Sequence, residues 1–426
     1  MTAANSPLSF RHGEWHIANC SLNKIAAEFK TPLFVYDQRF LENQFRSLRE
    51  ALPDIVDLYY SIKANPNPAI VSRFAACAAG LEIASAAEYE IARKAGAPVE
   101  RILFAGPGKT LEELEYVLQR GIGELHIESS EELDAIKALD VPVNVSIRFN
   151  PAAEASGGAM RMGGKPSQFG FDEEQLPQIV DQVLGAPGLI FRGLHMFAGT
   201  QLLDAEVLLS QWSHTVTVAR RIAAHVGEPL KTVDLGGGLG IPYFSSETAL
   251  DLTEVRKGAA VLFGSLEDDP LFSGTRFIVE PGRFLAGPAG VYIARVVSVK
   301  HSRGTRFIVL DGGMNHHLAA SGNLGQVIKK DYPILNVSRS EDAPREPAVV
   351  VGPLCTPLDT LGRRVTLPNT EPGDLIAVMQ SGAYGLSASP VGFLSHRLPA
   401  EVLIDGSIAN LVGERGSFAN PLRKFD

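Results

Sequence analysis

The sequence lacks several features that would assign it to particular protein classes. Only three of its 426 residues are cysteines, Cys20, Cys77 and Cys355, which is a sparse and odd set for a disulfide framework. No apolar run approaches the ~18 residues of a membrane-spanning helix. The first residues lack the basic start and apolar stretch of a secretory signal. We therefore expect a soluble, globular, cytoplasmic protein without a membrane span.

An excess of positive charge is also absent. The chain has 39 Lys and Arg against 48 Asp and Glu, a formal net charge of −9. This balance argues against general binding to nucleic acids or anionic membranes. Hydrophobic residues make up 45% of the chain, which is enough for a folded core. The length suggests two to three domains, or one large barrel with an accessory domain.

Residues 31–286 alternate short apolar runs with amphipathic stretches, such as the predicted helices 39–51, 68–79 and 87–95. The predicted strands are 33–36, 57–63, 81–85, 101–106, 124–128, 143–150, 191–199, 232–238 and 276–282. About eight strand–helix units predict an α/β fold, a parallel (β/α)8 barrel, with an open doubly wound sheet as the alternative.

The sequence pattern changes after Gly287, where long helical stretches become few. The β-rich runs 290–302, 305–313, 347–354, 374–385 and 401–407 are separated by turn residues and predict a second, mainly β domain. Residues 1–30 could pack against either part, and we group them with residues 287–426.

Lys63 ends an apolar strand in YYSIKAN. At the carboxyl end of a barrel strand a lysine amine can be desolvated, become nucleophilic and form a Schiff base with an aldehyde cofactor. Taken alone, a surface lysine is the commoner meaning. The run Gly236, Gly237 and Gly238 follows a strand and can expose backbone N–H groups to a phosphate, although a tight structural turn is equally compatible.

Glu280 ends another predicted strand in IVEPGRF, three residues before Arg283. A buried carboxylate there would keep a pyridine nitrogen protonated; the alternative is a surface ion pair. Cys355 in GPLC is by itself more typical of an inert thiol. The adjacent pair His316 and His317 is a poor metal site because consecutive side chains diverge, so we expect no metal.

In this order, the strand-end lysine, the glycine turn, EPGR, GPLC and GAYG resemble the fold type III pyridoxal-phosphate decarboxylases, the relatives of diaminopimelate and ornithine decarboxylases. The resemblance runs from about Pro32 to Gly406. It implies an alanine-racemase-like barrel plus a β domain, pyridoxal 5'-phosphate as cofactor, and a head-to-tail homodimer with active sites at the interface.

The resemblance also implies residue roles. Lys63 would bond covalently to the cofactor, and Cys355 would act catalytically in the neighbouring subunit's site. The cofactor contacts would come from Glu82, Glu88, Arg148, Phe197, Thr200, Gly236, Gly237, Gly238, Glu280, Gly282, Arg283 and Tyr384. The substrate contacts would come from His316, His317, Thr356 and Tyr384.

Departures from the family pattern concern the substrate. Phe197 stands where diaminopimelate decarboxylases have a histidine stacked on the cofactor ring. Ala319 replaces the substrate-binding arginine, Asn323 the tyrosine, and Thr356 the acid that binds a distal ammonium. Burying a charge without a partner is costly, so diaminopimelate is disfavoured as the substrate. Free lysine and ornithine become weaker candidates for the same reason.

The segment 162–170, Phe197, GGMNHH and GPLCTP are similar to the subgroup typified by the butirosin-pathway glutamyl-carrier-protein decarboxylase. This implies α-decarboxylation of an amino acid or derivative, with an acyl carrier protein as a possible partner. A decarboxylase of free diaminopimelate, lysine or ornithine is one alternative. A cofactor-free regulatory homologue that only binds partners is another, disfavoured by the retained residues.

Overall fold

The computed structural model describes residues 6–152, 160–161, 166–197, 199–244, 246–326, 329–340 and 342–423. The chain divides into two compact units. One comprises Gln44–Ile241 and Thr248–Phe284, and the other comprises the described residues up to Asn43, Pro242–Glu247 and the described residues from Leu285 onward. Within these ranges, every helix is too short or too polar to cross a bilayer.

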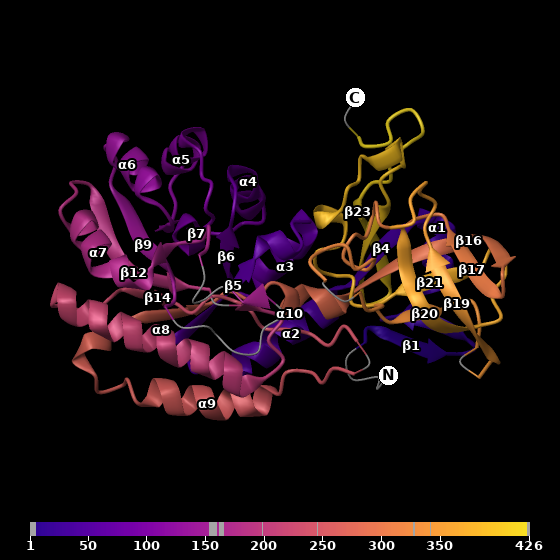
Figure 1. Ribbon diagram of the computed structural model, residues 1–426, viewed down its shortest axis with the longest axis horizontal. Helices are drawn as coiled ribbons and strands as arrows, with labels where there is room; N and C mark the ends of the chain where they lie inside the picture. Colours follow the sequence, from indigo (N-terminus) through magenta and orange to yellow (C-terminus); the bar gives the residue numbers. More distant parts are fainter. Residues whose placement is uncertain are drawn as a thin grey trace. The chain divides into compact units, whose positions relative to one another are not determined.

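The first unit is built on a closed barrel of parallel strands, which confirms the predicted fold class (Figure 1). Each strand pairs with the next around the ring, and pairing of β15 with β5 and of β8 with β9 completes the circle. The eight strands are β5 (Val56–Ser61), β6 (Gly80–Ile83), β7 (Ile102–Phe104), β8 (Glu124–Ile127), β9 (Val143–Asn150), β12 (Leu189–Met196), β14 (Thr232–Asp234) and β15 (Arg276–Val279).

Helices follow most of these strands and cover the outside of the barrel (Figure 1). Their starts carry caps that the sequence encodes, such as the capping box of Thr110 with Glu113 at the start of α5. The helices are α2 (Gln38–Ala51), α3 (Pro68–Ala76), α4 (Ala86–Lys94), α5 (Leu111–Leu118), α6 (Ser130–Ala138), α7 (Leu176–Leu184), α8 (Ala205–Val226), α9 (Leu252–Gly264) and α10 (Arg283–Ala286).

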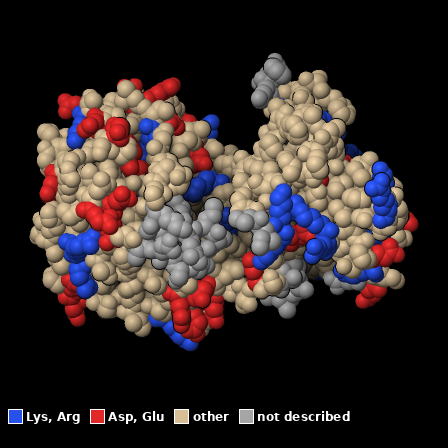
Figure 2. Space-filling view, viewed as in Figure 1, with Lys and Arg blue, Asp and Glu red and all other residues tan. Residues whose placement is uncertain are grey.

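Short elements complete this unit. The strand β11 (Phe171–Asp172) extends the sheet beside β9. Two two-residue strands, β10 (Met160–Arg161) and β13 (Gly199–Thr200), pair with each other. The 3-10 helix η2 (Ile62–Ala64) directly follows β5. Acidic and basic side chains are interspersed over the barrel side of the face in Figure 2, with no broad area of one sign.

The second unit is mainly β, as predicted. Its large sheet runs in the order β20, β19, β17, β16, β4, β22, β23, and β21 joins β16 to β18. The bounds are β4 (Leu33–Asp37), β16 (Gly290–Ser302), β17 (Thr305–Leu310), β18 (Ile334–Asn336), β19 (Arg345–Val351), β20 (Thr360–Pro368), β21 (Leu375–Val378), β22 (Ala400–Asp405) and β23 (Ile408–Gly413).

The placement of β4 corrects one expectation. The run 33–36 was predicted as the first strand of the barrel, but β4 pairs antiparallel with β16 and parallel with β22. All five residues of β4 are buried, as they would be in a barrel strand, so its apolar composition suits either sheet. The pairing partners lie more than 200 residues away in the sequence, beyond any local pattern.

The N-terminal segment packs within this β unit. The hairpin strands β1 (Leu8–Arg11), β2 (Glu14–Ile17) and β3 (Cys20–Ser21) precede helix α1 (Leu22–Phe29). Trp15 and Ile25 belong to the same buried apolar cluster as Val35 and Val291 of the large sheet. Burial of this cluster therefore holds the N-terminal segment to the sheet.

Candidate active site

The carboxyl ends of the barrel strands carry most of the predicted cofactor residues. Lys63 lies in η2, immediately after β5, and Glu82 lies on the neighbouring strand β6. Nζ of Lys63 is 3.0 Å from Oε1 and 3.1 Å from Oε2 of Glu82. The hydroxyl of Ser61 also donates to Glu82. Burial alone would raise the pKa of Glu82, but the charge of Lys63 and these hydrogen bonds bring it below its usual value.

The lysine itself is accessible from outside. Its side chain is 49% exposed, while Glu82 is 2% exposed. A buried carboxylate thus holds the amine, while about half of the lysine side chain is exposed. Glu88 accepts from the backbone N–H of Ala84 at 2.7 Å, and burial raises its pKa to about 7.

The glycine run follows β14 and turns sharply. Gly236 has φ +70° and donates its backbone N–H to Asp234, and its carbonyl accepts from the N–H of Glu280. A Cβ on Gly237 would lie 2.4 Å from the carbonyl oxygen of Glu280. A Cβ on Gly238 would lie 2.6 Å from the carbonyl oxygen of Gly199, the neighbour of Thr200. Only glycine fits this turn, which brings strand-end backbones into contact.

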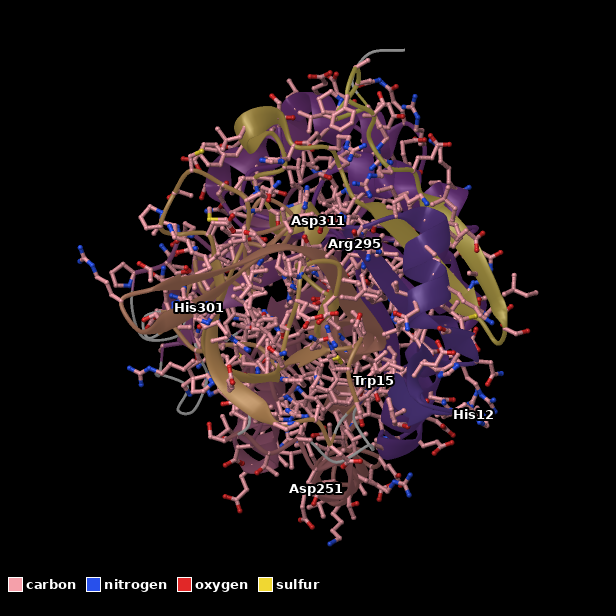
Figure 3. The ribbon with its side chains drawn as sticks, turned by 90° about the vertical axis from the view of Figure 1, so that its right-hand side faces the viewer. His12, Trp15, Asp251, Arg295, His301 and Asp311 are labelled. Atoms are coloured by element: carbon pink, nitrogen blue, oxygen red, sulfur yellow. The ribbon has the colours of Figure 1, made fainter. Side chains whose placement is uncertain are left out.

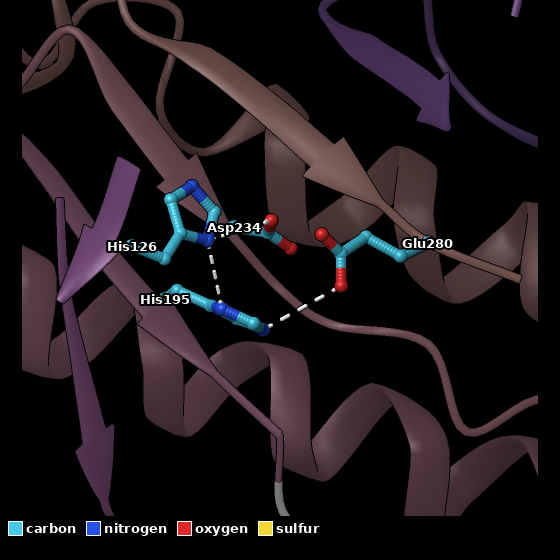
Figure 4. Close-up of side chains that lie close together, drawn as sticks. All are labelled: His126, His195, Asp234 and Glu280. Carbon is cyan, nitrogen blue, oxygen red and sulfur yellow. Dashed lines mark hydrogen bonds and ion pairs between the residues drawn. The ribbon is translucent and has the colours of Figure 1, made fainter. Parts of the chain in front are cut away.

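Figure 4 shows a buried cluster of His126, His195, Asp234 and Glu280 from four barrel strands or strand ends. The Nδ1 atoms of the two histidines are 2.9 Å apart, and Nε2 of His195 is 3.5 Å from Oε2 of Glu280. Oε1 of Glu280 is buried without a hydrogen-bond partner in the described part of the chain. These donor atoms would also suit a metal ion, and the expectation of no metal stays a prediction.

Burial sets the protonation of this cluster. It raises the pKa of Glu280 well above its usual value, with Asp234 and Glu82 adding repulsion. Burial also raises the pKa of Asp234. The pKa of His195 is lowered well below its usual value by burial and by His126 and Arg148, so its imidazole is neutral. The cluster therefore favours neutral carboxyls until a cation arrives to pair with them.

Arg148 lies on β9 beside this cluster. Its Nη1 is 2.8 Å from Oε1 of Glu128, and its guanidinium carbon is 6.0 Å from the ring centre of Phe197. Phe197 directly follows β12 and is half-buried. Gly282 packs against the end of η2, since a Cβ there would meet Ala64 at 2.8 Å, and Arg283 begins α10. The barrel unit thus contains the predicted cofactor residues other than Tyr384.

The remaining predicted residues belong to the β unit. Cys355 is exposed in the turn after β19, and the Thr356 hydroxyl accepts from the N–H of Leu358. Tyr384 lies in a turn after β21 with φ +52°. Their roles stay predictions.

The two adjacent histidines are buried and hydrogen-bonded within the β unit. His316 is paired with the carbonyl of Arg397 and the Tyr292 hydroxyl, and His317 with the Ser381 hydroxyl. Burial lowers the pKa of each to about 3, so both are neutral. Their predicted contact with substrate stays a prediction.

The positions expected to hold a distal substrate charge are neutral. Ala319 is buried, and the Asn323 amide donates to the Ser321 hydroxyl and to the carbonyl of Leu358. Nζ of Lys329 donates to Oδ1 of Asn323. A cation therefore lies beside Asn323. None of Ala319, Asn323 and Thr356 carries a carboxylate that could pair with a distal ammonium. Residues 162–165 of the segment 162–170 lie outside the described residues.

Sequence reasoning missed several members of the site. His126, His195, Asp234 and Glu128 were read only as parts of strands. Each is a polar residue within or at the end of an apolar, buried strand, and burying such a group is costly without a purpose. A polar residue near the carboxyl end of a barrel strand was the available signal.

The comparisons with known proteins agree with this geometry. The family model "Pyridoxal-dependent decarboxylase, pyridoxal binding domain" matches residues 38–287. The chain is 39% identical to L-glutamyl-[BtrI acyl-carrier protein] decarboxylase of Niallia circulans, over 94% of this chain and 95% of that relative. It is 30% identical to diaminopimelate decarboxylase of Aquifex aeolicus, over 97% and 96%. Its fold matches diaminopimelate decarboxylase from M. jannaschii in complex with L-lysine, with TM-score 0.90, 25% identity and coverage of 99% and 98%.

Proposed function

Because the chain belongs to the pyridoxal-dependent decarboxylases, and is thus a pyridoxal-phosphate enzyme acting on amino acids, we propose that its substrate is tethered. The substrate class is an amino acid whose side-chain carboxylate is held as a thioester on an acyl carrier protein. The Niallia circulans relative, whose name specifies a glutamyl group on a carrier protein, supports this class. The neutral positions Ala319, Asn323 and Thr356 support it independently.

The barrel residues fit the cofactor. Glu280 offers a buried, unpartnered Oε1 to a ring N–H, and a ring cation there would offset the repulsion between Glu280 and Asp234. The glycine turn leaves no room for a Cβ at the carboxyl end of β14, and backbone N–H groups of such a turn can bind a phosphate. Lys63 supplies an accessible amine. We assign these residues, with Glu82, Arg148, Phe197, Thr200, Gly282 and Arg283, to cofactor binding.

Each residue then has a task in the reaction. The bound cofactor supplies an electron sink for the pair left behind when carbon dioxide departs. Glu280 holds negative charge against the ring nitrogen, which preserves that sink. Glu82 orients Nζ of Lys63 by accepting hydrogen bonds from it at 3.0 and 3.1 Å. Phe197 offers an aromatic face for stacking but no titratable proton.

The charge of the distal pocket decides between tethered and free substrates. A free diaminopimelate, lysine or ornithine carries a distal ammonium that needs a carboxylate partner, and Thr356 offers only a hydroxyl. A thioester has no distal charge. Lys329, beside Asn323, would accept a free carboxylate, so free glutamate is the discriminating competitor.

A carbon dioxide release assay tests the proposal. We expect carrier-loaded glutamate to exceed free diaminopimelate by at least roughly tenfold in kcat/KM, about 1.4 kcal/mol. The assay compares carrier-loaded and free glutamate and aspartate with free lysine, ornithine and diaminopimelate. Thr356→Glu should raise turnover of free lysine, whereas Leu358→Glu serves as its neighbouring control. Efficient turnover of free diaminopimelate or lysine without gain from tethering would overturn the carrier proposal and leave the decarboxylase assignment intact.

We further propose a cytoplasmic homodimer whose active site receives Cys355 and Tyr384 from the partner. The exposure of Cys355 is compatible with this role. A cofactor-free regulatory homologue is not supported, since the relatives named above are decarboxylases and the barrel retains the residues that fit the cofactor.

A further inference from the structure

A cavity lies within the mainly β unit. Its volume is about 530 Å³, within the range of small-molecule sites. Its lining includes Lys30 after α1, Arg295 on β16, and Arg397 and Arg415 from the C-terminal part of the chain. None of the residues assigned above to the cofactor lines it, although His316, a predicted substrate contact, does.

The lining is strongly basic in an acidic protein. Four cationic side chains face a single carboxylate, Asp311, although the whole chain has a net charge of −9. Asp311 is already engaged, because it accepts from the Thr31 hydroxyl at 2.6 Å and from the N–H of Arg295 at 2.8 Å. Figure 3 shows Arg295 of β16 close to Asp311, which directly follows the neighbouring strand β17. The cavity therefore holds uncompensated positive charge.

Arg415 is the least satisfied of these cations. Its Nε and Nη1 atoms are buried and lack a hydrogen-bond acceptor among the described residues. Burial and the charge of Arg397 lower its pKa. Arg415 is half-buried, and burying two of its N–H groups without acceptors is costly; a bound anion would supply those acceptors.

Arg397 and Phe418 form the solvent-facing side of the cavity. The guanidinium carbon of Arg397 is 3.9 Å from the ring centre of Phe418, and Phe418 is 87% exposed. Stacking holds the guanidinium in place beside the cavity while leaving its N–H edge available to a ligand. The site thus combines fixed donors with an apolar surface.

We propose that this cavity binds an organic phosphate ester. A carboxylate needs only one guanidinium fork, whereas three guanidinium groups and an ammonium match the charge and the several oxygens of a phosphoryl group. The volume exceeds that of a phosphate ion, which leaves room for an organic part against Phe418. The ester is either a free phosphorylated metabolite or the phosphopantetheine arm of a carrier protein, and the site itself does not depend on the proposed substrate.

Titration calorimetry on the holoenzyme, freed of excess cofactor, tests this site. The ligands are phosphopantetheine, adenosine monophosphate and, as the carboxylate control, acetate. The variants are Arg415→Gln and Arg397→Gln, with Arg364→Gln as the control because Arg364 is exposed in the same unit and does not line the cavity. The Arg397 variant keeps the test valid if Arg415→Gln fails to fold.

We expect at least one ester to bind, with affinity at least about tenfold weaker in both cavity variants, unchanged in Arg364→Gln, and falling as salt rises. Tighter binding of phosphopantetheine identifies the carrier arm, and tighter binding of the nucleotide identifies a free metabolite. Absence of ester binding, equal binding by all variants, or equal binding of acetate would overturn the site. Decarboxylation of free and tethered substrates, measured in parallel, tests the proposed function separately.

Discussion

At the scale of single residues, the chemistry depends on charges that the barrel has removed from water. Glu280 and Asp234 are buried beside each other, and burial raises the pKa of each, so the anionic form of each is destabilised. A cationic ring nitrogen at Glu280 relieves that repulsion, so the protein and its cofactor stabilise each other's charged forms. Glu82 differs because Lys63 already compensates it.

The raised pKa of Asp234 predicts a pH dependence of stability. Burial raises it from an ordinary value of 3.8 to about 7, so folding favours the protonated form. This contribution is fully present below the ordinary value and is lost as pH rises toward 7. We expect the Tm of cofactor-free protein to fall over that window by at least about 3 °C more than that of Asp234→Asn.

Calorimetric scans of both proteins between pH 4 and about 7.5 measure this difference. Asp134→Asn is the matched control, because the Asp134 side chain is 75% exposed. Added cofactor should reduce the fall in the parent protein. Identical slopes for the parent and Asp234→Asn would show that Asp234 is not the group responsible.

Lys63 carries the second prediction at this scale. Lys63→Ala should abolish covalent attachment of the cofactor and reduce decarboxylation by at least about a thousandfold, since the nucleophilic amine is removed. Peptide mass spectrometry after borohydride reduction should place the pyridoxyl group on Lys63 in the parent. Lys257→Ala, on the exposed face of α9, should behave like the parent. A pyridoxyl group on Lys109 or another lysine would refute the assignment.

At the scale of elements, local patterns predicted the barrel strands but not all of their neighbours. Each of the eight strands of the ring appears in the sequence as a short apolar run between helical stretches. β4 has the same composition, yet its partners β16 and β22 are distant in the chain, so pairing could not be read from it.

The site shows the same division. Lys63, the glycine turn and Glu280 follow strands and were visible as motifs. The contact between His126 and His195 needs the sheet to place β8 and β12 on either side of β9, and no spacing in the sequence encodes that distance.

The turn after β14 gives a prediction at this scale. Gly237→Ala should weaken cofactor affinity at least about tenfold, because a Cβ would press on the backbone of Glu280 at 2.4 Å and displace it. Equilibrium dialysis of the cofactor measures the change. Gly264→Ala, at the end of α9 where a Cβ meets nothing within 4 Å, is the control. Unchanged affinity in Gly237→Ala would remove the turn from the cofactor site.

At the scale of the whole molecule, the two units of the chain carry different parts of the predicted site. The barrel unit alone assembles the residues that fit the cofactor, whereas the predicted catalytic Cys355 belongs to the β unit. A thiol that served only packing would be expected in the interior, but Cys355 is exposed. This exposure is compatible with a cysteine that acts across a subunit interface.

Mixing of inactive variants tests that arrangement. If one subunit's Cys355 completes the partner's site, a dimer of Lys63→Ala with Cys355→Ala contains one site with both residues intact. Random exchange of equal amounts should therefore restore about a quarter of the parent's activity, by the symmetry of a two-fold dimer. Carbon dioxide release after exchange, with differently tagged subunits to prove that mixed dimers form, gives the measurement. Mixing of Cys20→Ala, altered on β3, with Lys63→Ala gives the control for exchange alone. If proven mixed dimers of Lys63→Ala and Cys355→Ala stay inactive, each site is built from a single chain. In that case the site of one subunit lacks Lys63 and the site of the other lacks Cys355, so neither can act.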